Sequence, residues 1–342
     1  MKFLLIINHR NACLSITGVL RALGADFYVP ALCHIEPDSA LVQGPLAKSL
    51  RTIDDPILDT INFYTNATPE NIAKMITRLN ESYDAVLFIP NIFSLEISHL
   101  ICAKSTKKVI IYQWGNIAQC DPYTYIPTHI LPGSSPSTHP TIYYGYSLEA
   151  NFASDYKNLF KNKIILPLTL NPAVEKYQRV SNENKKGMVI ISRLHNGYSQ
   201  NLYSSAKYLI DKYKLHVCFY GHNEGASIPI PYEHNFSCDL ETLYAKMKES
   251  QYLIYLINEP YVVQYSALEA ISIGLPVFYL KGTLLGRLIG ESNYFECNSL
   301  DEMGSKITAQ NFGQADIKIQ KNCLKYFSSE YATECWNKLL SN

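Results

Sequence analysis

The amino-acid sequence predicts an α/β protein with two Rossmann-like, doubly wound domains that face a cleft. Short apolar runs rich in β-branched and aromatic residues alternate with helical patterns, which is typical of parallel sheets covered by helices. The chain has 342 residues, more than one hydrophobic core usually organises. A polar stretch at 171–187 interrupts this alternation, and a second alternation follows it. Two tandem domains with ligand space between them fit this pattern.

The first alternation begins with MKFLLIINHR, whose apolar run is too short for a signal peptide and is better read as a buried strand. A helix over 70–83 is predicted because Ile72, Met75, Ile76 and Leu79 recur at the three-and-four spacing of one helical face. The expected strands in this half are 2–8, 27–32, 84–90, 107–114, 141–147 and 163–170, and the other expected helices are 14–25, 94–105 and 149–160.

The second alternation has the same character and ends in an amphipathic tail. Its expected strands are 188–194, 216–221, 252–257 and 276–280, and its expected helices are 199–213, 240–250 and 265–274. The predicted domain boundaries are therefore 1–170 and 188–315, with a linker over 171–187 and a terminal helical segment over 316–342.

The composition argues against several classes of function. Lysine and arginine (30) balance aspartate and glutamate (30), which offers no basic face for nucleic acid. The nine cysteines form no CxxC and no zinc-ligand spacing, so we expect reduced thiols in a cytoplasmic protein and no bound metal or other cofactor. No GxGxxG and no P-loop is present, which argues against a dinucleotide oxidoreductase and a P-loop enzyme. No apolar run reaches the roughly 18 to 20 residues that cross a bilayer.

One helical stretch, YSALEAISIG, carries a single carboxylate among apolar residues. Glu269 shares a stripe with Ser266 and Ser272, and Gly274 and Pro276 end the helix. A buried carboxylate must find hydrogen-bond donors or face a cleft. In parallel sheets, ligands bind at the carboxyl ends of strands, where helix N-termini offer N–H groups to anions. Glu269 could serve as a core carboxylate, but its position favours a ligand site.

The segment EPYVVQYSALEAISIGLPV resembles the nucleotide-sugar-binding region of GT-B glycosyltransferases, especially the retaining GT4-like group. The family pattern is an acidic residue, a short loop, Glu-Ala on a helix and Gly-x-Pro-Val on a strand. Two upstream strands, MVIISRL and HVCFYGHNEG, are also similar to the family, so the resemblance covers about 188–290. The matching residues are Glu259, Pro260, Tyr261, Glu269, Ala270, Gly274, Pro276 and Val277.

The resemblance implies roles for the matching positions. Arg193 and the N–H groups at the start of the 265–273 helix would hold the donor diphosphate, whose developing charge is the main catalytic problem. Glu269 would accept hydrogen bonds from the ribose, and Glu259 and Lys281 would act at the sugar and diphosphate. The terminal helix would cross back to the first domain, which is the acceptor-side domain. The remaining candidates are Tyr265, Ser266, Gly221, Thr283 and Leu284 for the donor, and His9, Arg10 and Trp114 for the acceptor.

Three departures from the family pattern bear on the activity. Nine residues separate Glu259 from Glu269, where the family has seven. Tyr198 and Ser199 stand where the family often has a lysine. Gln113 and Trp114 replace a histidine common at an N-domain strand end, and Gly18 comes late in the first loop. Acceptor handling is therefore expected to differ from the family's.

These observations lead to a metal-independent glycosyltransferase, in line with the absence of the Asp-x-Asp that metal-dependent GT-A enzymes use. Its expected partners are a nucleotide sugar and a glycan, lipid-linked or protein acceptor, and a lipid-linked acceptor would bring it to the inner face of a membrane. Two alternatives stay open. A nucleotide-sugar epimerase of the same fold could use His222 and His234, and a non-catalytic protein could bind nucleotide sugars or glycans without turnover.

Overall fold

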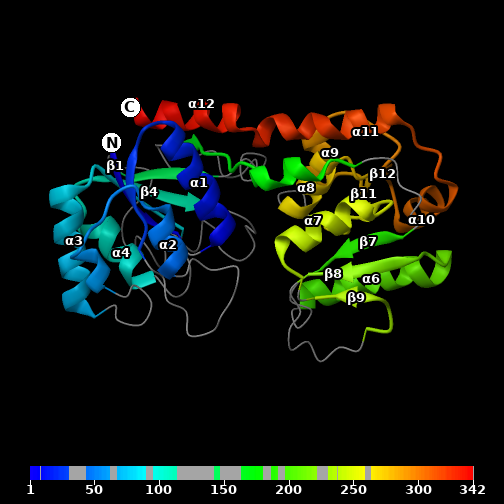
Figure 1. Ribbon diagram of the computed structural model, residues 1–342, viewed down its shortest axis with the longest axis horizontal. Coiled ribbons are helices and arrows are strands. Elements are labelled where there is room, and N and C mark those ends of the chain that lie inside the picture. The colour runs from blue at the N-terminus through cyan, green and yellow to red at the C-terminus, as the bar shows by residue number, and fades with distance from the viewer. Residues whose placement is uncertain are drawn as a thin grey trace. The chain divides into compact units, whose positions relative to one another are not determined.

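The computed structural model describes residues 1–7, 9–30, 44–61, 68–89, 95–113, 142–146, 163–179, 186–191, 197–221, 230–236, 238–258 and 263–341. The chain divides into two compact α/β units (Figure 1). Unit 1 comprises Met1–Thr169 and Tyr326–Asn342, and unit 2 comprises Leu170–Lys325. The chain therefore passes from one unit to the other twice, and the second passage returns it to unit 1.

Unit 1 is built on a sheet of six parallel strands in the order β2-β1-β3-β4-β5-β6. Apolar side chains of its strands and helices form one buried cluster, which includes Leu4, Val86 and Ile111. The strands are β1 (Lys2–Ile6), β2 (Asp26–Tyr28), β3 (Ala85–Phe88), β4 (Lys108–Gln113), β5 (Ile142–Tyr146) and β6 (Lys163–Ile165). The helices are α1 (Arg10–Ala22), α2 (Gly44–Leu50), η1 (Leu58–Thr60), α3 (Pro69–Ser82), α4 (Leu95–Lys104) and α12 (Ser329–Leu340).

Helix α3 shows how closely local sequence sets an element. The Thr68 hydroxyl accepts a hydrogen bond from the Asn71 N–H at 3.3 Å, and Pro69 occupies the first helical position. Both features are strong helix-start signals. The predicted apolar stripe, from Ile72 to Leu79, is buried. The predicted helix over 70–83 is therefore confirmed.

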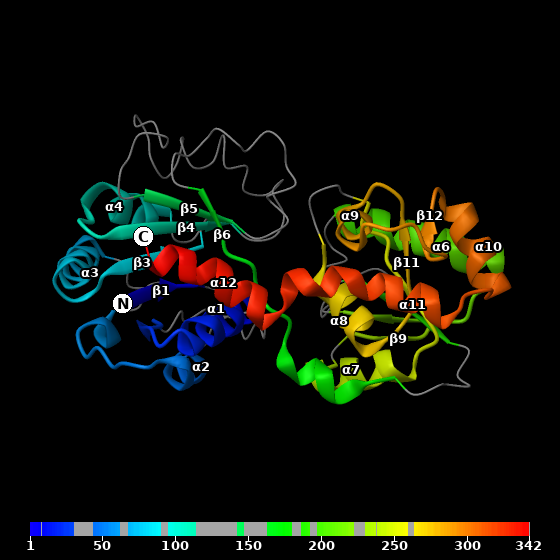
Figure 2. The same cartoon turned by 90° about the horizontal axis from the view of Figure 1, so that it is seen from above.

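Helix α12 belongs to unit 1 although it follows all of unit 2 in the sequence. It packs against α1 and β6 (Figure 2), and its Trp336 side chain is completely buried. The ammonium group of Lys108 on β4 donates to the carbonyl oxygen of Leu339 at 3.3 Å. A cation at this end of the helix favours the helix dipole.

Unit 2 has its own sheet of six parallel strands, in the order β12-β11-β10-β7-β8-β9. The strands are β7 (Gly187–Ile190), β8 (Val217–Tyr220), β9 (His234–Asn235), β10 (Leu253–Ile254), β11 (Val277–Leu280) and β12 (Glu296–Cys297). The helices are η5 (Pro172–Tyr177), α6 (Gly197–Tyr213), α7 (Leu240–Glu249), α8 (Tyr265–Ile273), α9 (Leu284–Ile289), α10 (Leu300–Ala309), α11 (Gln314–Gln320) and η6 (Lys321–Phe327), which runs across the boundary to unit 1.

The segment predicted as the interdomain linker contains the short helix η5, which belongs to unit 2. Asn171 caps η5 by accepting from the Ala173 N–H at 3.0 Å, and Val174 is buried. The backbone N–H of Arg179 then donates to the Ile273 carbonyl, at the end of α8, at 2.9 Å. These contacts could not be predicted from the sequence, because the composition of 171–187 is mostly polar.

Most predicted elements have a counterpart in the structure, and most of the added elements are short. The structure adds α2, η1, η5, β9, α9, β12 and the ten-residue α10, and β9 and β12 have two residues each. Two-residue strands carry no periodic signal. The predicted helix over 149–160 lies outside the described residues.

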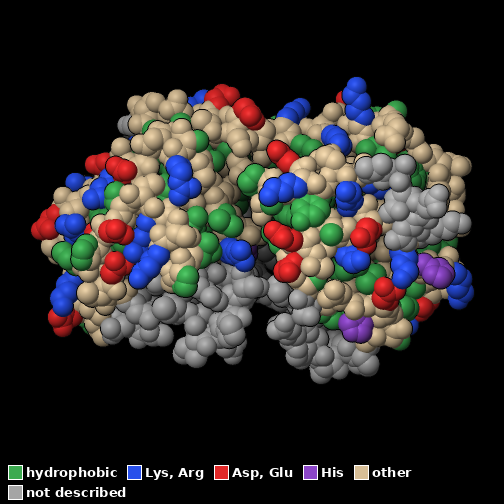
Figure 3. All heavy atoms as spheres, in the orientation of Figure 1, with side chains coloured by type: hydrophobic (Ala, Val, Ile, Leu, Met, Phe, Trp, Pro, Cys, Tyr) green, Lys and Arg blue, Asp and Glu red, His purple; other side chains and the backbone are tan. Residues whose placement is uncertain are grey.

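Charged side chains of both signs are mixed on the surface that Figure 3 shows. Unit 2 also has the ion pairs Lys207–Asp211 at 2.8 Å and Lys212–Asp301 at 2.6 Å. None of the helices that the structure describes is long and apolar enough to cross a membrane.

Candidate functional site

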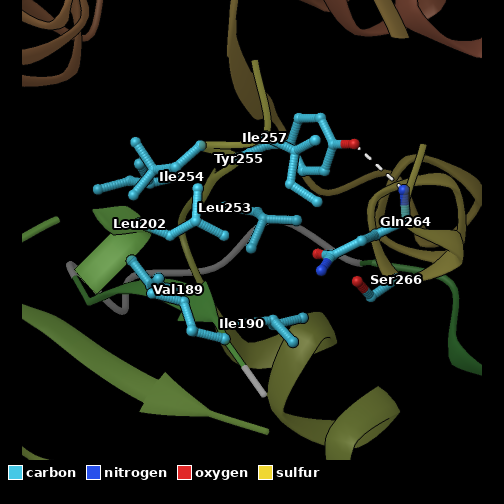
Figure 4. Close-up of a pocket in the computed structure, with 11 residues that line it drawn as sticks. Val189, Ile190, Leu202, Leu253, Ile254, Tyr255, Ile257, Gln264 and Ser266 are labelled. Carbon is cyan, nitrogen blue, oxygen red and sulfur yellow. Dashed lines mark hydrogen bonds between the residues drawn. The ribbon is translucent and has the colours of Figure 1, made fainter. Parts of the chain in front are cut away.

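A pocket lies in unit 2, where the strands β7 and β10 end and the first turn of α8 begins (Figure 4). Most of its lining residues are aliphatic, and Tyr255 and two residues from the start of α8, Gln264 and Ser266, bring polar side-chain groups to it. Figure 4 shows the Gln264 and Ser266 side chains turned toward the strand residues. The lining residues are Val189, Ile190, Ile191, Leu202, Leu253, Ile254, Tyr255, Leu256, Ile257, Gln264 and Ser266.

The N-terminus of α8 supplies hydrogen-bond donors at this pocket. Gln264 occupies the N-cap position without a side-chain capping bond, and the first turn carries no acidic residue. The Gln264 N–H donates to the Tyr255 hydroxyl at 3.1 Å. The N–H groups in the first turn of a helix lack the usual partner one turn earlier and carry partial positive charge, and in α8 the Ala267 N–H already donates to the Gln264 carbonyl at 3.0 Å. This end of α8 therefore suits an anionic group.

The local sequence explains why α8 ends where it does. Gly274 adopts the left-handed conformation, with φ of 93°, and its N–H bonds back to the Ile271 carbonyl at 3.0 Å. Only glycine adopts this conformation readily. Pro276 then prevents the helix from continuing, and β11 begins at Val277.

Glu269 lies one turn beyond Ser266 and is 5% exposed. Its Oε1 accepts a hydrogen bond from the Tyr244 hydroxyl on α7 at 2.8 Å. Burial raises the pKa of Glu269 to about 6, and the hydrogen bond from Tyr244 acts in the opposite direction. Glu269 is absent from the residues that line the pocket, and its carboxyl lies between α8 and α7.

Other donor-side candidates lie near the same edge of the sheet. Gly221 follows β8 with φ of 132°, and the exposed Lys281 follows β11. Thr283 and Leu284 are buried, and the Thr283 hydroxyl donates to the Leu280 carbonyl at 2.8 Å and accepts from the Gly286 N–H at 3.4 Å. Neither these four residues nor the half-buried Tyr265 lines the pocket.

The remaining candidates fall in two groups. Arg193, Glu259 and Trp114 lie outside the described residues, as does His222. His9 and Arg10 lie in unit 1, where β1 leads into α1. His9 is the half-buried N-cap residue of α1, and Arg10 is exposed in its first turn.

The structure adds three residues that sequence reasoning missed, namely Tyr244, Tyr255 and Gln264. Tyr255 falls in a predicted strand, and Gln264 directly precedes a predicted helix. Strand ends and helix starts meet at the ligand-binding edge of a parallel sheet, and this was the signal that could have found both residues. Tyr244 sits three residues before the buried Met247 and carries no local sign of its contact with Glu269. Among the described residues, no three His, Cys, Asp or Glu side chains come together as a metal site.

Comparisons with known proteins show the fold. No protein-family model and no curated protein sequence matches the chain. Solved structures match it over their full length, including HepE of Anabaena in complex with UDP-glucose, with a TM-score of 0.66, 12% identity and coverage of 100% of this chain and 99% of that chain.

Two further structures show the same architecture. A glycosyltransferase from Rickettsia africae has a TM-score of 0.63 at 13% identity, and covers 100% of this chain and 98% of its own. The UDP-GlcNAc 2-epimerase from Methanocaldococcus jannaschii has a TM-score of 0.55 at 11% identity, with 100% of both chains covered. At these identities the likeness shows the fold, and it confirms the predicted α/β class with parallel sheets shared by GT-B proteins.

Proposed function

We propose that this protein is a glycosyltransferase that moves a sugar from a nucleotide-diphosphate sugar to a glycan, lipid-linked or protein acceptor, without a metal ion and with retention. One observation carries the proposal. The pocket at the ends of β7 and β10 receives the start of α8, in a fold shared with a protein solved in complex with UDP-glucose.

The chemistry of sugar transfer fits the donors at this pocket. The leaving group is a nucleoside diphosphate, so the transition state gains negative charge on phosphate oxygens. The first-turn N–H groups of α8 and the Ser266 hydroxyl would bind those oxygens, and no acidic side chain in that turn would repel them. Arg193 and Lys281 would add positive charge, and Glu269 would accept hydrogen bonds from the ribose.

The remaining candidates belong to the sugar and the acceptor. Glu259 would act at the sugar, and Thr283 and Leu284 would line the space around it. The Thr283 hydroxyl already bonds to backbone groups of the protein, so Thr283 would contact the sugar through its own backbone. His9, Arg10 and Trp114 would contact the acceptor. A lipid-linked acceptor would bring a cytoplasmic protein to the inner face of a membrane.

Nucleotide binding is the first test. A ligand that binds only the native state raises the melting temperature. We expect one of UDP, GDP, ADP and CMP to raise it clearly above the others. The protein should then hydrolyse or transfer sugar from the matching nucleotide sugar, measured by release of the nucleotide. Failure of every nucleotide to raise the melting temperature would rule out the proposed function.

A nucleotide-sugar epimerase is the second candidate, because a UDP-GlcNAc 2-epimerase shares the fold over the whole chain. Such a reaction needs acid and base groups at the sugar. His234 is exposed on β9, and its Nδ1 lies 2.9 Å from the Tyr232 carbonyl oxygen. Chromatography of the nucleotide sugar after incubation separates the two functions, because an epimerase converts the sugar while it stays attached. Binding without either change would indicate a non-catalytic protein.

A further inference from the structure

The side chain of Tyr244 is completely buried on α7, and its hydroxyl donates to Oε1 of Glu269 at 2.8 Å. Among the described residues, no other side chain hydrogen-bonds this carboxyl and no cation pairs with it. Among the described residues Tyr244 thus engages one oxygen, Oε1, of a nearly buried carboxyl. The proposed contact with a ribose hydroxyl would use the other oxygen, Oε2.

The hydroxyl also affects the charge of the carboxyl. Burial raises the pKa of Glu269 to about 6, and the bond from Tyr244 opposes that rise because it stabilises the charged form. A carboxylate is a stronger acceptor than a neutral carboxylic acid. Loss of the hydroxyl would therefore both release Oε1 and leave more of the carboxyl neutral at a given pH.

Several titratable and charged groups surround the Tyr244–Glu269 pair. Among the described elements, α7, η5 and β11 make the main contacts with α8. The Tyr177 ring of η5 lies 5.6 Å from the Tyr244 ring, and Arg179 follows η5 and reaches the other end of α8, near Gly274. The other titratable residues of these elements are Glu241, Lys246, Lys248 and Glu249 on α7, Glu175 and Lys176 on η5, and Tyr279 on β11.

We propose that Tyr244 is a positioning residue for the nucleotide sugar, which orients Glu269 and keeps it in its charged, hydroxyl-accepting form. Donor affinity then weakens as the pH falls and Glu269 takes up a proton. The inference rests on the proposed function, because it needs a nucleotide ribose at Glu269. Tyr244 itself touches no donor atom and acts through Glu269.

Calorimetric titration with UDP-glucose, GDP-glucose or ADP-glucose from pH 5 to pH 8 tests the proposal, because these diphosphates carry no terminal phosphate that titrates in this range. The wild type should lose affinity as the pH falls through about 6. Tyr244→Phe should bind about three- to tenfold more weakly at pH 7, since a hydrogen bond to a charged group is lost. Its pH profile should also move to higher pH. The matched control is Tyr279→Phe, which removes another buried hydroxyl, one that accepts from Asn293 at 2.8 Å, and should leave the profile in place.

Glu269→Gln tests the same idea without the tyrosine, and it decides the matter if Tyr244→Phe fails to fold. Glutamine cannot titrate, so its weaker affinity should not change with pH in this range. If the wild type binds and Tyr244→Phe shows the same pH profile as the wild type, the role of Tyr244 is overturned and the proposed function stands. Absence of binding to all three nucleotide sugars by the folded wild type would overturn this inference, and failure of the whole nucleotide panel to raise the melting temperature would overturn the proposed function as well.

Discussion

The side-chain amide of Gln320 forms two hydrogen bonds with the backbone of Val277, 43 residues earlier in the chain. Its Nε2 donates to the Val277 carbonyl at 2.6 Å, and its Oε1 accepts from the Val277 N–H at 3.1 Å. The amide is 1% exposed. A side chain thus joins the end of α11 to the start of β11 within unit 2.

Replacing this amide should destabilise the protein. Gln320→Leu leaves a buried N–H and a buried carbonyl of Val277 without partners, at a cost of about 2 to 5 kcal/mol. Urea unfolding measures the loss. Gln314→Leu, at an exposed position of the same helix, is the matched control and should change stability by less than about 0.5 kcal/mol. Equal stability of the two variants would show that the amide contributes nothing.

Asp55 should make unit 1 sensitive to acid. The carboxylate is completely buried and accepts from Arg78 Nε and the Tyr83 hydroxyl, each at 2.8 Å. Burial alone would raise the pKa of Asp55, but these bonds together outweigh burial and lower it. A lowered pKa adds stability above the unfolded-state value, and that stability is lost as the pH falls through the folded-state value.

Asp55→Asn should therefore cost roughly 2 to 4 kcal/mol at pH 7, since Arg78 would lose its charged partner while still partly exposed. The difference from the wild type should shrink as the pH falls below about 4. Denaturant unfolding across this pH range provides the measurement. The exposed Asp26→Asn serves as the control, and a difference that stays constant with pH would argue against the assigned pKa direction.

Glu269 should have the opposite effect on stability. Its folded-state pKa of about 6 exceeds the ordinary glutamate pKa of 4.5, so its contribution to stability is fully present below pH 4.5 and is lost as the pH rises through 6. Glu269→Gln should accordingly be more stable than the wild type by about 2 kcal/mol at pH 8. At pH 4 the two should agree closely. Thermal unfolding at both pH values decides this, and a less stable variant at pH 8 would contradict it.

The start of α8 should tolerate no negative charge when the nucleotide binds. Ser266→Asp places a carboxylate in the first turn, where it would occupy the donors meant for phosphate and repel the diphosphate. We expect at least about a hundredfold loss of UDP affinity, or about 3 kcal/mol. Ser305→Asp adds the same charge at an exposed position of α10 and should bind normally. Similar affinities in calorimetry would remove this helix end from the site.

Local signals predicted the fold because most of its elements carry them. The three-and-four spacing from Ile72 to Leu79 predicted α3, and Gly274 and Pro276 predicted the end of α8, without information from the rest of the chain. The position of Ser266 at the pocket followed from the same reasoning, since helix starts meet strand ends in parallel sheets. The contact between Tyr244 and Glu269 could not be predicted, because it depends on how α7 packs against α8. The Gln320 amide is a second example, since nothing near it in the sequence indicates Val277.

The assignment of α12 to unit 1 bears on how the protein is made. Ribosomes release the chain from its N-terminus, so every residue of unit 2 is synthesised before Trp336 becomes available to the hydrophobic interior of unit 1. Until unit 2 has been translated, the surface of α1 and β6 that α12 covers stays exposed in unit 1. A fragment that ends at Thr169 would have the same exposed surface, and a separate peptide spanning 326–342 would cover it.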